Sequence, residues 1–372
     1  MLFVGDYKEI FMKIAVIFGG KSSEHDISVI TGVMVVNAVS VRHDVIPVYV
    51  NKNGEMINGK GFDDTKTFCG QVKGKRVTFI PGSGGMTVGG KFIKPDCVIN
   101  ACHGRCGEDG AISGLMELCD IPYVGSDVRS SAVGMDKLLF KQVMSSYGIK
   151  ILPYFGVSKY EYSNVNYDVA EPIKELGFPV IVKPCNLGSS IGVGVAKSFK
   201  DLYVLLDGAF IWDRRAVVEK ALTDFIEVNC AVLGYDDKVI SSEVEQPVGF
   251  KEFLSFDDKY CRSLKTEVRK MPACLSDSVR EQIRSIAIKV FKAVGCSGVA
   301  RVDFLMDGEE IYVNEINTVP GSLSEYLFGY GGVTFVELID RLINDSLKIK
   351  KQKDGLKYFF DTNVLSDKKR HK

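Results

Sequence analysis

The residues most able to do chemistry lie on two short segments near the C-terminal end of the chain. Residues 298–304 (GVARVDF) and 311–317 (IYVNEIN) alternate apolar with polar side chains, as strands do, and Asp307-Gly308 between them predicts a turn. Because successive side chains point to opposite faces of a strand, four polar groups are expected on one face of this hairpin: Arg301, Asp303, Glu315 and Asn317. If the register pairs the two carboxylates, this face offers the oxygen ligands that Mg²⁺ takes beside phosphates. For Asp303 alone, an ordinary polar position is the better interpretation; the set of four favours the metal site.

A lysine followed by a glycine-rich loop forms a second candidate site. Lys183-Pro184 ends an apolar stretch, and residues 185–194 (CNLGSSIGVG) follow it. The exposed N–H groups of such a loop can hold phosphate oxygens while the lysine supplies positive charge. The GxxxxGK[ST] order is absent, so a flexible hairpin is an equal alternative for this segment alone. Further along, residues 219–222 (EKAL) offer backbone groups for an adenine edge, and Glu227 could reach ribose hydroxyls.

The composition is that of a soluble globular protein. The 372 residues are 46% hydrophobic, and Lys plus Arg equals Asp plus Glu at 47 each, so the charge favours neither nucleic acid nor a membrane surface. No apolar run has the length of a membrane span, and residues 1–12 lack a signal-peptide core. Met12 directly precedes the first strand, so residues 1–11 are expected to be a short extension or a start-site artefact.

The ten cysteines do not have the spacing of a disulfide framework or of paired CxxC motifs. The segment from Cys102 to Cys106 holds a histidine between two cysteines, and reduced thiols explain it better than a metal site does. These features predict a cytoplasmic protein.

The elements that would position the candidate groups fall into three blocks. Residues 1–134 alternate strands with helices and predict an α/β domain with an open, mostly parallel sheet. Residues 135–222 contain a helix over 137–147, three strands and the glycine-rich loop, and predict an antiparallel α+β unit. Residues 223–372 predict a second α+β unit that carries the metal-site hairpin.

The third block has three further features. A long polar segment spans residues 247–272, and a helix is predicted over 276–294. Another helix is predicted to begin at Thr334, because Thr334 and Glu337 have capping-box spacing. The lysine-rich tail after Lys348 is expected to be solvated.

Four motifs, in this order and spacing, resemble the ATP-grasp fold: VIVKPCNLGSSIGVG, EKAL, GVARVDFL and NEINTVPG. The opening IAVIFGGKSSEHDIS and the segment HGRCGEDG narrow the resemblance to the D-alanine–D-alanine ligase family. It runs from about Lys13 to about Leu347. It implies an N-terminal open parallel sheet domain followed by two α+β domains that clasp ATP.

The resemblance also implies roles for individual residues on the nucleotide side. Those matching contacts to ATP are Lys137, Lys183, Glu219, Lys220, Ala221, Leu222, Glu227 and Lys259. Asp303, Glu315 and Asn317 match the ligands of two Mg²⁺ or Mn²⁺ ions. Arg301 matches the guanidinium that steadies the transferred phosphoryl group and the oxyanion, and Gly321 could offer that oxyanion a backbone N–H.

On the amino-acid side, Glu24 matches the carboxylate that binds the ammonium of the first substrate, and Ser189 and Tyr260 match its hydrogen-bonding partners. His103 and Glu108 match residues that line the same pocket. The segment 247–272 would be a lid, in which Lys259 reaches the γ-phosphate as it closes.

The chain departs from the family pattern at the pocket for the second substrate. Tyr326 occupies the position of a pocket serine, Leu323 that of a threonine, and Leu327 completes the substrate-binding segment. These differences bear on the identity of the second substrate more than on the chemistry.

The function implied is ATP-dependent ligation of two D-alanines through an acyl phosphate, giving D-alanyl-D-alanine, ADP and phosphate for peptidoglycan synthesis, cell-wall biogenesis and cell shape. Small molecules are the expected partners, and a homodimer is one possible assembly. The alternatives are a ligase with another acceptor, such as D-serine, and a non-catalytic ATP-binding regulator. A nucleotide-linked dehydrogenase, suggested by Phe18-Gly19-Gly20, lacks GxGxxG and leaves Lys183, Arg301 and Glu315 unexplained.

Overall fold

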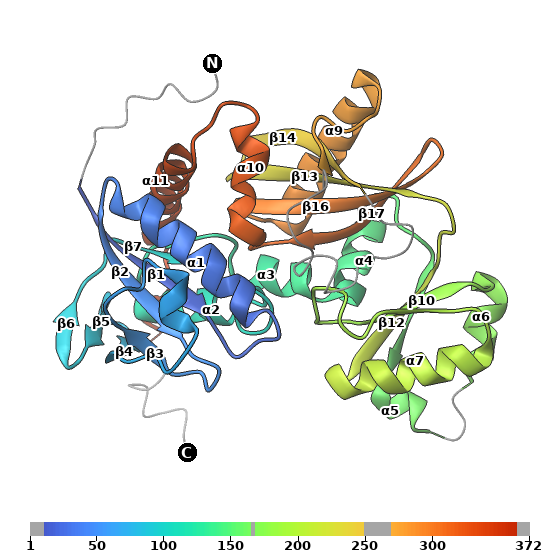
Figure 1. The fold of residues 1–372 in the computed structure, drawn as a ribbon, viewed down its shortest axis with the longest axis horizontal. Coiled ribbons are helices and arrows are strands. Elements are labelled where there is room, and N and C mark those ends of the chain that lie inside the picture. The colour runs from blue at the N-terminus through green and yellow to red at the C-terminus, as the bar shows by residue number, and fades with distance from the viewer. Residues whose placement is uncertain (1–10, 165–167, 249–268, 363–372) are drawn as a thin grey trace.

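The structure is a computed structural model that describes residues 11–164, 168–248 and 269–362. Three sheets with their covering helices organise the chain (Figure 1). Within the described ranges, every helix is too short or too polar to cross a bilayer.

The first sheet has eight strands in the order β6-β5-β4-β3-β2-β1-β7-β8. The part β2-β1-β7-β8 is parallel, as predicted, whereas β3 to β6 extend one edge as an antiparallel meander. Turns such as Asn53-Gly54 reverse the chain there without a crossover helix. The strands are β1 (Lys13–Gly19), β2 (Asp44–Val50), β3 (Met56–Asn58), β4 (Lys75–Ile80), β5 (Gly85–Val88), β6 (Lys91–Ile93), β7 (Cys97–Asn100) and β8 (Tyr123–Val124).

Helices from both ends of the chain share the core of this sheet. The N-terminal ones are α1 (His25–Ser40) and α2 (Ala111–Cys119), and the C-terminal ones are α10 (Glu325–Gly329) and α11 (Phe335–Asp354). A further helix, α3 (Val128–Met135), packs instead with the third sheet described below. Val33 and Val36 of α1 belong to the same buried cluster as Leu338 and Leu342 of α11. Figure 1 accordingly shows α11 beside the blue N-terminal sheet.

Helix α11 begins with the predicted capping box, in which Thr334 and Glu337 bond reciprocally. It continues to Asp354, so part of the predicted solvated tail is helical. Lys350 lies 3.0 Å from Asp120 and Lys353 pairs with Glu117, both at the end of α2. Most of the described tail after Lys350 is exposed, as expected, while Lys350 and Lys353 also face carboxylates of the N-terminal unit.

The second sheet is antiparallel, in the order β11-β10-β12-β9. Its strands are β9 (Tyr154–Ser158), β10 (Val180–Pro184), β11 (Gly194–Ala196) and β12 (Arg215–Lys220). Its helices are α5 (Lys159–Tyr162), α6 (Ala170–Leu176) and α7 (Phe199–Trp212). The glycine-rich loop joins β10 to β11, as predicted, so Lys183 lies near the carboxyl end of a buried strand.

The third sheet is also antiparallel, in the order β15-β14-β13-β16-β17. Its strands are β13 (Ile226–Tyr235), β14 (Lys238–Pro247), β15 (Arg269–Lys270), β16 (Gly298–Asp307) and β17 (Glu310–Asn317). Helices α4 (Lys137–Ser146) and α9 (Asp277–Val294) bury Phe140, Met144, Ile283 and Phe291 in its core. Helix α4 thus precedes the second sheet in sequence but packs with the third.

Candidate active site

The hairpin of β16 and β17 has the register that the metal-site prediction required. Asp303 pairs with Glu315 and Arg301 with Asn317. The register shifts immediately after Asp303, which marks a bulge in the hairpin at this pair. The predicted juxtaposition of the two carboxylates is confirmed.

Arg301 and Asp303 form a bidentate pair on this face. Nε and Nη2 of Arg301 donate to the two Asp303 carboxylate oxygens over 2.6 and 2.8 Å, and Asn317 Nδ2 donates to one of them over 3.0 Å. Burial alone would lower the pKa of Arg301, but Asp303 outweighs it and raises that pKa well above its ordinary value. The guanidinium is therefore a fixed positive charge.

Lys137 connects the hairpin to the glycine-rich loop. Its ammonium lies 3.3 Å from Glu315 Oε2 and donates to the Leu187 carbonyl over 2.9 Å. Asp136 fixes its position, because that carboxylate caps α4 and pairs with Arg215 of β12. Burial would lower the pKa of Lys137, but Glu315 raises it overall.

Lys183 and Glu219, on neighbouring strands, form a buried ion pair behind the loop. Lys183 Nζ lies 3.2 Å from Glu219 Oε2 and donates to Asn314 Oδ1 over 3.0 Å. A second lysine, Lys141, lies 3.2 Å from the same Glu219 oxygen. Burial would raise the pKa of Glu219, but the two lysines lower it overall. Sequence reasoning missed Lys141, although its position four residues after Lys137 places both on one face of α4.

The segment expected to contact adenine has part of its backbone already engaged. The N–H of Lys220 donates to Pro153 over 2.9 Å, and that of Ala221 donates to Pro179 over 3.1 Å. These two groups are therefore not available to a nucleotide, which leaves carbonyl groups and Leu222 for such contacts. Glu227, on β13, lines both cavities described below.

Glu24 and Ser189 meet across the cleft, as predicted. Ser189 donates its hydroxyl to Glu24 Oε1, and the two side chains are 9% and 7% exposed. A Cβ on Gly188 would lie 2.9 Å from Glu24 Oε2, and one on Gly104 only 2.6 Å from it, so close approach requires glycine at both positions. The N-terminal unit and the glycine-rich loop thus form one site.

His103 and Glu108 lie beside Glu24. His103 Nδ1 donates to the Val319 carbonyl over 2.8 Å, so the unprotonated Nε2 accepts from the Thr31 hydroxyl, also 2.8 Å away. Burial, reinforced by the positive charge of Arg301, lowers the pKa of His103 to about 4. Burial and the neighbouring Glu24 carboxylate raise the pKa of Glu108 to about 8.

A cleft of about 510 Å³ joins these groups to the segment expected to bind the second substrate. It is lined by Glu24, His103, Glu108, Arg301 and Gly321, and also by Tyr326. A smaller cavity of about 50 Å³ beside it is lined by Lys137, Lys183, the glycine-rich loop and Glu315. Most of the predicted amino-acid, phosphate and metal residues therefore converge on two adjoining cavities.

The second-substrate side differs from the prediction in one respect. Tyr326 lines the cleft, but Leu323 and Leu327 are 2% and 0% exposed in the core shared with α11 and do not line it. Residues 322–324 all have φ between 51° and 53°, a left-handed conformation that costs roughly 1–2 kcal/mol per residue without glycine. Strain of this kind is concentrated at functional sites, where the surrounding packing enforces it.

Two charged residues that the sequence did not suggest surround Tyr326. The Arg269 guanidinium lies 4.1 Å from the centre of its ring. Glu245, 4% exposed, pairs with the Tyr326 hydroxyl, and its Oε2 atom has no hydrogen-bond partner among the residues that the structure describes. Burial, reinforced by Glu245, raises the pKa of Tyr326, so the phenol is neutral. Lys259, Tyr260 and most of the predicted lid lie outside the described residues.

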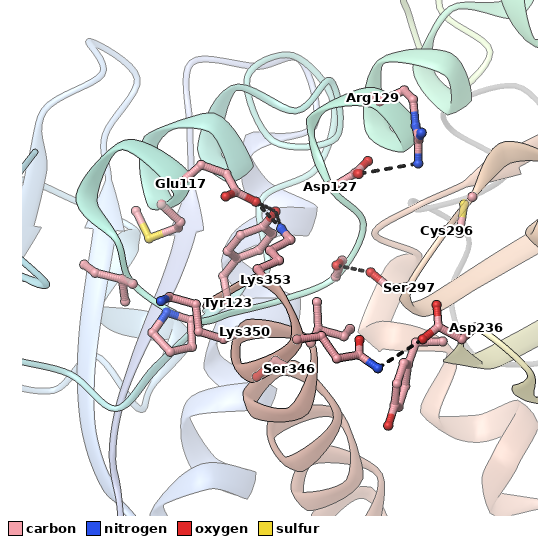
Figure 2. Close-up of a pocket in the computed structure, with 18 of the residues that line it drawn as sticks. Glu117, Tyr123, Asp127, Arg129, Asp236, Cys296, Ser297, Ser346, Lys350 and Lys353 are labelled. Carbon is pink, nitrogen blue, oxygen red and sulfur yellow. Dashed lines mark hydrogen bonds and ion pairs between the residues drawn. The ribbon is translucent and has the colours of Figure 1, made fainter. Parts of the chain in front are cut away.

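Another pocket, of about 190 Å³, lies between α2, α3, α11 and the β13–β14 turn (Figure 2). Its charged groups pair with one another: Lys353 with Glu117, and Arg129 with Asp127 at 3.7 Å. Gln352 donates to Asp236 over 3.4 Å. This pocket joins parts of the fold and is lined by none of the predicted site residues.

Comparison with known proteins agrees with the geometry. Residues 13–126 match the model of the D-ala D-ala ligase N-terminus, and residues 143–344 match that of the C-terminus. The chain is 36% identical to the D-alanine–D-alanine ligase of Geobacillus thermodenitrificans, with 94% of this chain and 99% of that protein covered. It is 35% identical to that of Treponema denticola, with 89% and 95% covered. The chain belongs to the D-alanine–D-alanine ligase family.

Solved structures of this family share the fold. The D-alanine–D-alanine ligase from Coxiella burnetii superimposes with a TM-score of 0.79 at 28% identity, with 92% of this chain and 96% of that one covered. The VanG D-Ala:D-Ser ligase from Enterococcus faecalis superimposes with a TM-score of 0.77 at 29% identity, with 91% and 100% covered. The predicted ATP-grasp fold is confirmed.

The hairpin face suits the divalent ions that the resemblance implies. Its donors are the carboxylates of Asp303 and Glu315 and the amide oxygen of Asn317, all hard ligands of the kind Mg²⁺ prefers. Among the residues that the structure describes, no group of three or more His, Cys, Asp or Glu side chains could hold a metal ion. Asn317 and phosphate oxygens would therefore have to complete any coordination shell.

The buried neutral His103 predicts a loss of stability in acid. Its pKa is about 4 in the folded chain and 6.5 as a free side chain, so the unfolded state binds more protons between these values. The contribution of His103 to stability should therefore fall by roughly 3 kcal/mol as the pH drops through this window. Urea unfolding of the wild type and His103→Gln between pH 4 and 7 measures this (the range spans the two pKa values). The stability difference between wild type and variant should change by about this amount across the range, because the opposite contribution of Glu108, whose pKa is raised, is common to both proteins. Identical pH dependence of the two proteins would refute the assignment.

Proposed function

We propose that this protein joins two D-amino acids at the expense of ATP, with D-alanine in both positions, to form D-alanyl-D-alanine, ADP and phosphate. The observation that carries this is the convergence of the Arg301–Asp303–Glu315 face, two phosphate-side lysines and the Glu24–Ser189 pair on adjoining cavities. ATP use and D-alanine ligation follow from the family. The roles of the individual residues in the two half-reactions are our proposal.

In the first half-reaction, a carboxylate oxygen of the first D-alanine attacks the γ-phosphorus of ATP, giving an acyl phosphate and ADP. Glu24 receives the substrate ammonium, and Ser189, which donates to Glu24, holds that carboxylate in place. Lys137 and Lys183, beside the glycine-rich loop, hold phosphate oxygens. Two Mg²⁺ or Mn²⁺ ions at Asp303, Glu315 and Asn317 would supply further charge neutralisation when bound.

In the second half-reaction, the amine of the second D-alanine attacks the acyl carbon, and phosphate leaves. Arg301 and Gly321 both line the cleft, and the Arg301 guanidinium and the Gly321 backbone N–H would stabilise the developing oxyanion. Glu227 would hold the ribose, and carbonyl groups of residues 219–222 would hold the adenine edge. The lid that contains Lys259 and Tyr260 would exclude water, which otherwise hydrolyses the acyl phosphate.

D-Serine is the second candidate acceptor, because of Glu245. A buried carboxylate oxygen without a partner favours a ligand that donates a hydrogen bond, which the hydroxyl of serine does and the methyl of alanine does not. The similar fold of a D-Ala:D-Ser ligase supports this candidate only as a relative.

Tyr326 is predicted to select the acceptor. Its ring, fixed by Glu245 and Arg269, narrows the second subsite. Tyr326→Ser should change the ratio of kcat/KM for D-alanine and D-serine as acceptors by roughly 10- to 200-fold. The KM of the first D-alanine should stay constant, and an effect confined to the first subsite would contradict the placement.

The overall proposal is tested by incubating the protein with MgATP and a panel of D- and L-amino acids. Products should be identified by mass and chirality. D,D-dipeptide with one ADP per product is expected; L,L-dipeptides alone, or no turnover with any amino acid, would overturn it.

A cytoplasmic place in peptidoglycan synthesis and a homodimeric assembly complete the proposal. Cell fractionation tests the cytoplasmic location, and the peptidoglycan precursor pool of a strain depleted of the protein tests the role in synthesis. Light scattering after size exclusion tests the homodimer.

A further inference from the structure

Lys141 is a buried lysine that the proposed mechanism does not use. Burial lowers its pKa, and Glu219 opposes this shift. Its side chain is 1% exposed within the core beside α4, and its ammonium lies 3.2 Å from Glu219 Oε2. The centre of the Tyr154 ring lies 5.7 Å from the same ammonium. Lys141 does not line the cavity that holds the glycine-rich loop, so it cannot contact a phosphate there directly.

The same carboxylate oxygen also holds Lys183. Lys183 Nζ is 3.2 Å from Glu219 Oε2, and unlike Lys141 it lines the phosphate-side cavity. Together with the Lys137–Glu315 pair, three ammonium groups face two carboxylates here. Glu227 lines the same cavity, so the carboxylates balance the three ammonium groups, and an incoming phosphate must compete with carboxylates for Lys183.

This arrangement resolves a conflict between two demands on Lys183. A phosphate must draw the Lys183 ammonium away from Glu219, which is 1% exposed. A carboxylate left buried without a counter-ion is strongly destabilised. If Lys183 were its sole partner, phosphate binding would therefore be opposed by the loss of that ion pair.

We propose that Lys141 is a positioning residue that serves as the permanent counter-ion of Glu219 and so releases Lys183 to the phosphates of the nucleotide. The inference rests on the proposed phosphate role of Lys183. If the proposal is correct, Lys141 affects the affinity for phosphate groups but not the affinity for the nucleoside, although it contacts neither part of the nucleotide.

The test compares ADP with adenosine by calorimetric titration of the full chain. In Lys141→Met, Glu219 keeps hold of Lys183, so the preference for ADP over adenosine should fall about tenfold, the order of one charge-assisted hydrogen bond. Removing the charge of Glu219 as well, in Lys141→Met/Glu219→Gln, should restore the preference for ADP, because Lys183 then has no ion pair with residue 219. Lys150→Met, which removes a surface lysine paired with Glu310, should bind both ligands like the wild type.

If Lys141→Met weakens the binding of ADP and adenosine equally, Lys141 has a merely structural role and the proposal is overturned. The proposal is also overturned if the double variant does not recover the preference for ADP. If Lys141→Met does not fold, Glu219→Gln is compared with the double variant. The proposal requires the same ADP preference in both, and a lower preference in the double variant refutes it. A wild-type protein without any ADP preference would instead refute the phosphate role of Lys183.

Discussion

Glu315→Gln should lower kcat by about 10²–10³-fold, comparable to the loss of one preorganised electrostatic contact in an active site. The side chain stands opposite Asp303 and pairs with Lys137 at 3.3 Å. Neutralising it removes one of the two carboxylates that would hold the ions beside the phosphates. The amide keeps the size of the side chain, so the fold should persist.

The effect should be visible in metal binding as well as in rate. Titration of Mn²⁺ in the presence of ADP should show weaker binding in Glu315→Gln. Glu310→Gln, at the exposed start of the same strand, is the matched control and should retain wild-type behaviour. Wild-type activity of Glu315→Gln at low Mg²⁺ would exclude this carboxylate from the site.

Lys183→Met should nearly abolish turnover, with a fall in kcat/KM for ATP of at least about 10²-fold, because a positive charge beside the phosphates is lost. The fold should survive, since Lys141 remains to pair with Glu219 at 3.2 Å. Steady-state kinetics with varied ATP measure the loss of turnover, and a thermal unfolding scan shows whether the fold is retained.

Lys200→Met serves as the control for Lys183, because it removes an exposed lysine of the neighbouring helix α7. It should change neither kcat/KM for ATP nor the temperature of unfolding. ATP affinity in Lys183→Met equal to that of the wild type would show that this lysine does not contact the phosphates.

Residues close in sequence allowed the central part of the site to be predicted. The two-residue periodicity of β16 and β17 and the short turn between them determine which side chains share a face. Asp303 and Glu315 therefore met as expected. The lysine before the glycine-rich loop is local in the same sense, because the strand end and the loop place it together.

What the sequence did not reveal depends on contacts between distant elements. Glu245 becomes informative only when β14 lies beside α10, and Lys141 only when α4 packs beside β12. Leu327 looked like a pocket residue by its position after Tyr326, but α10 turns it into the core. The docking of α11 on the N-terminal sheet likewise joins chain ends that no periodic pattern connects.

The central claim is that an acyl phosphate links ATP cleavage to joining of the two amino acids. D-Alanine labelled with ¹⁸O in both carboxylate oxygens tests it directly, because the oxygen that attacks phosphorus leaves with the phosphate. Mass spectrometry should find one ¹⁸O atom in the inorganic phosphate for each D-alanyl-D-alanine formed, and ADP as the nucleotide product. Unlabelled phosphate, or AMP and pyrophosphate in place of ADP, would contradict the account.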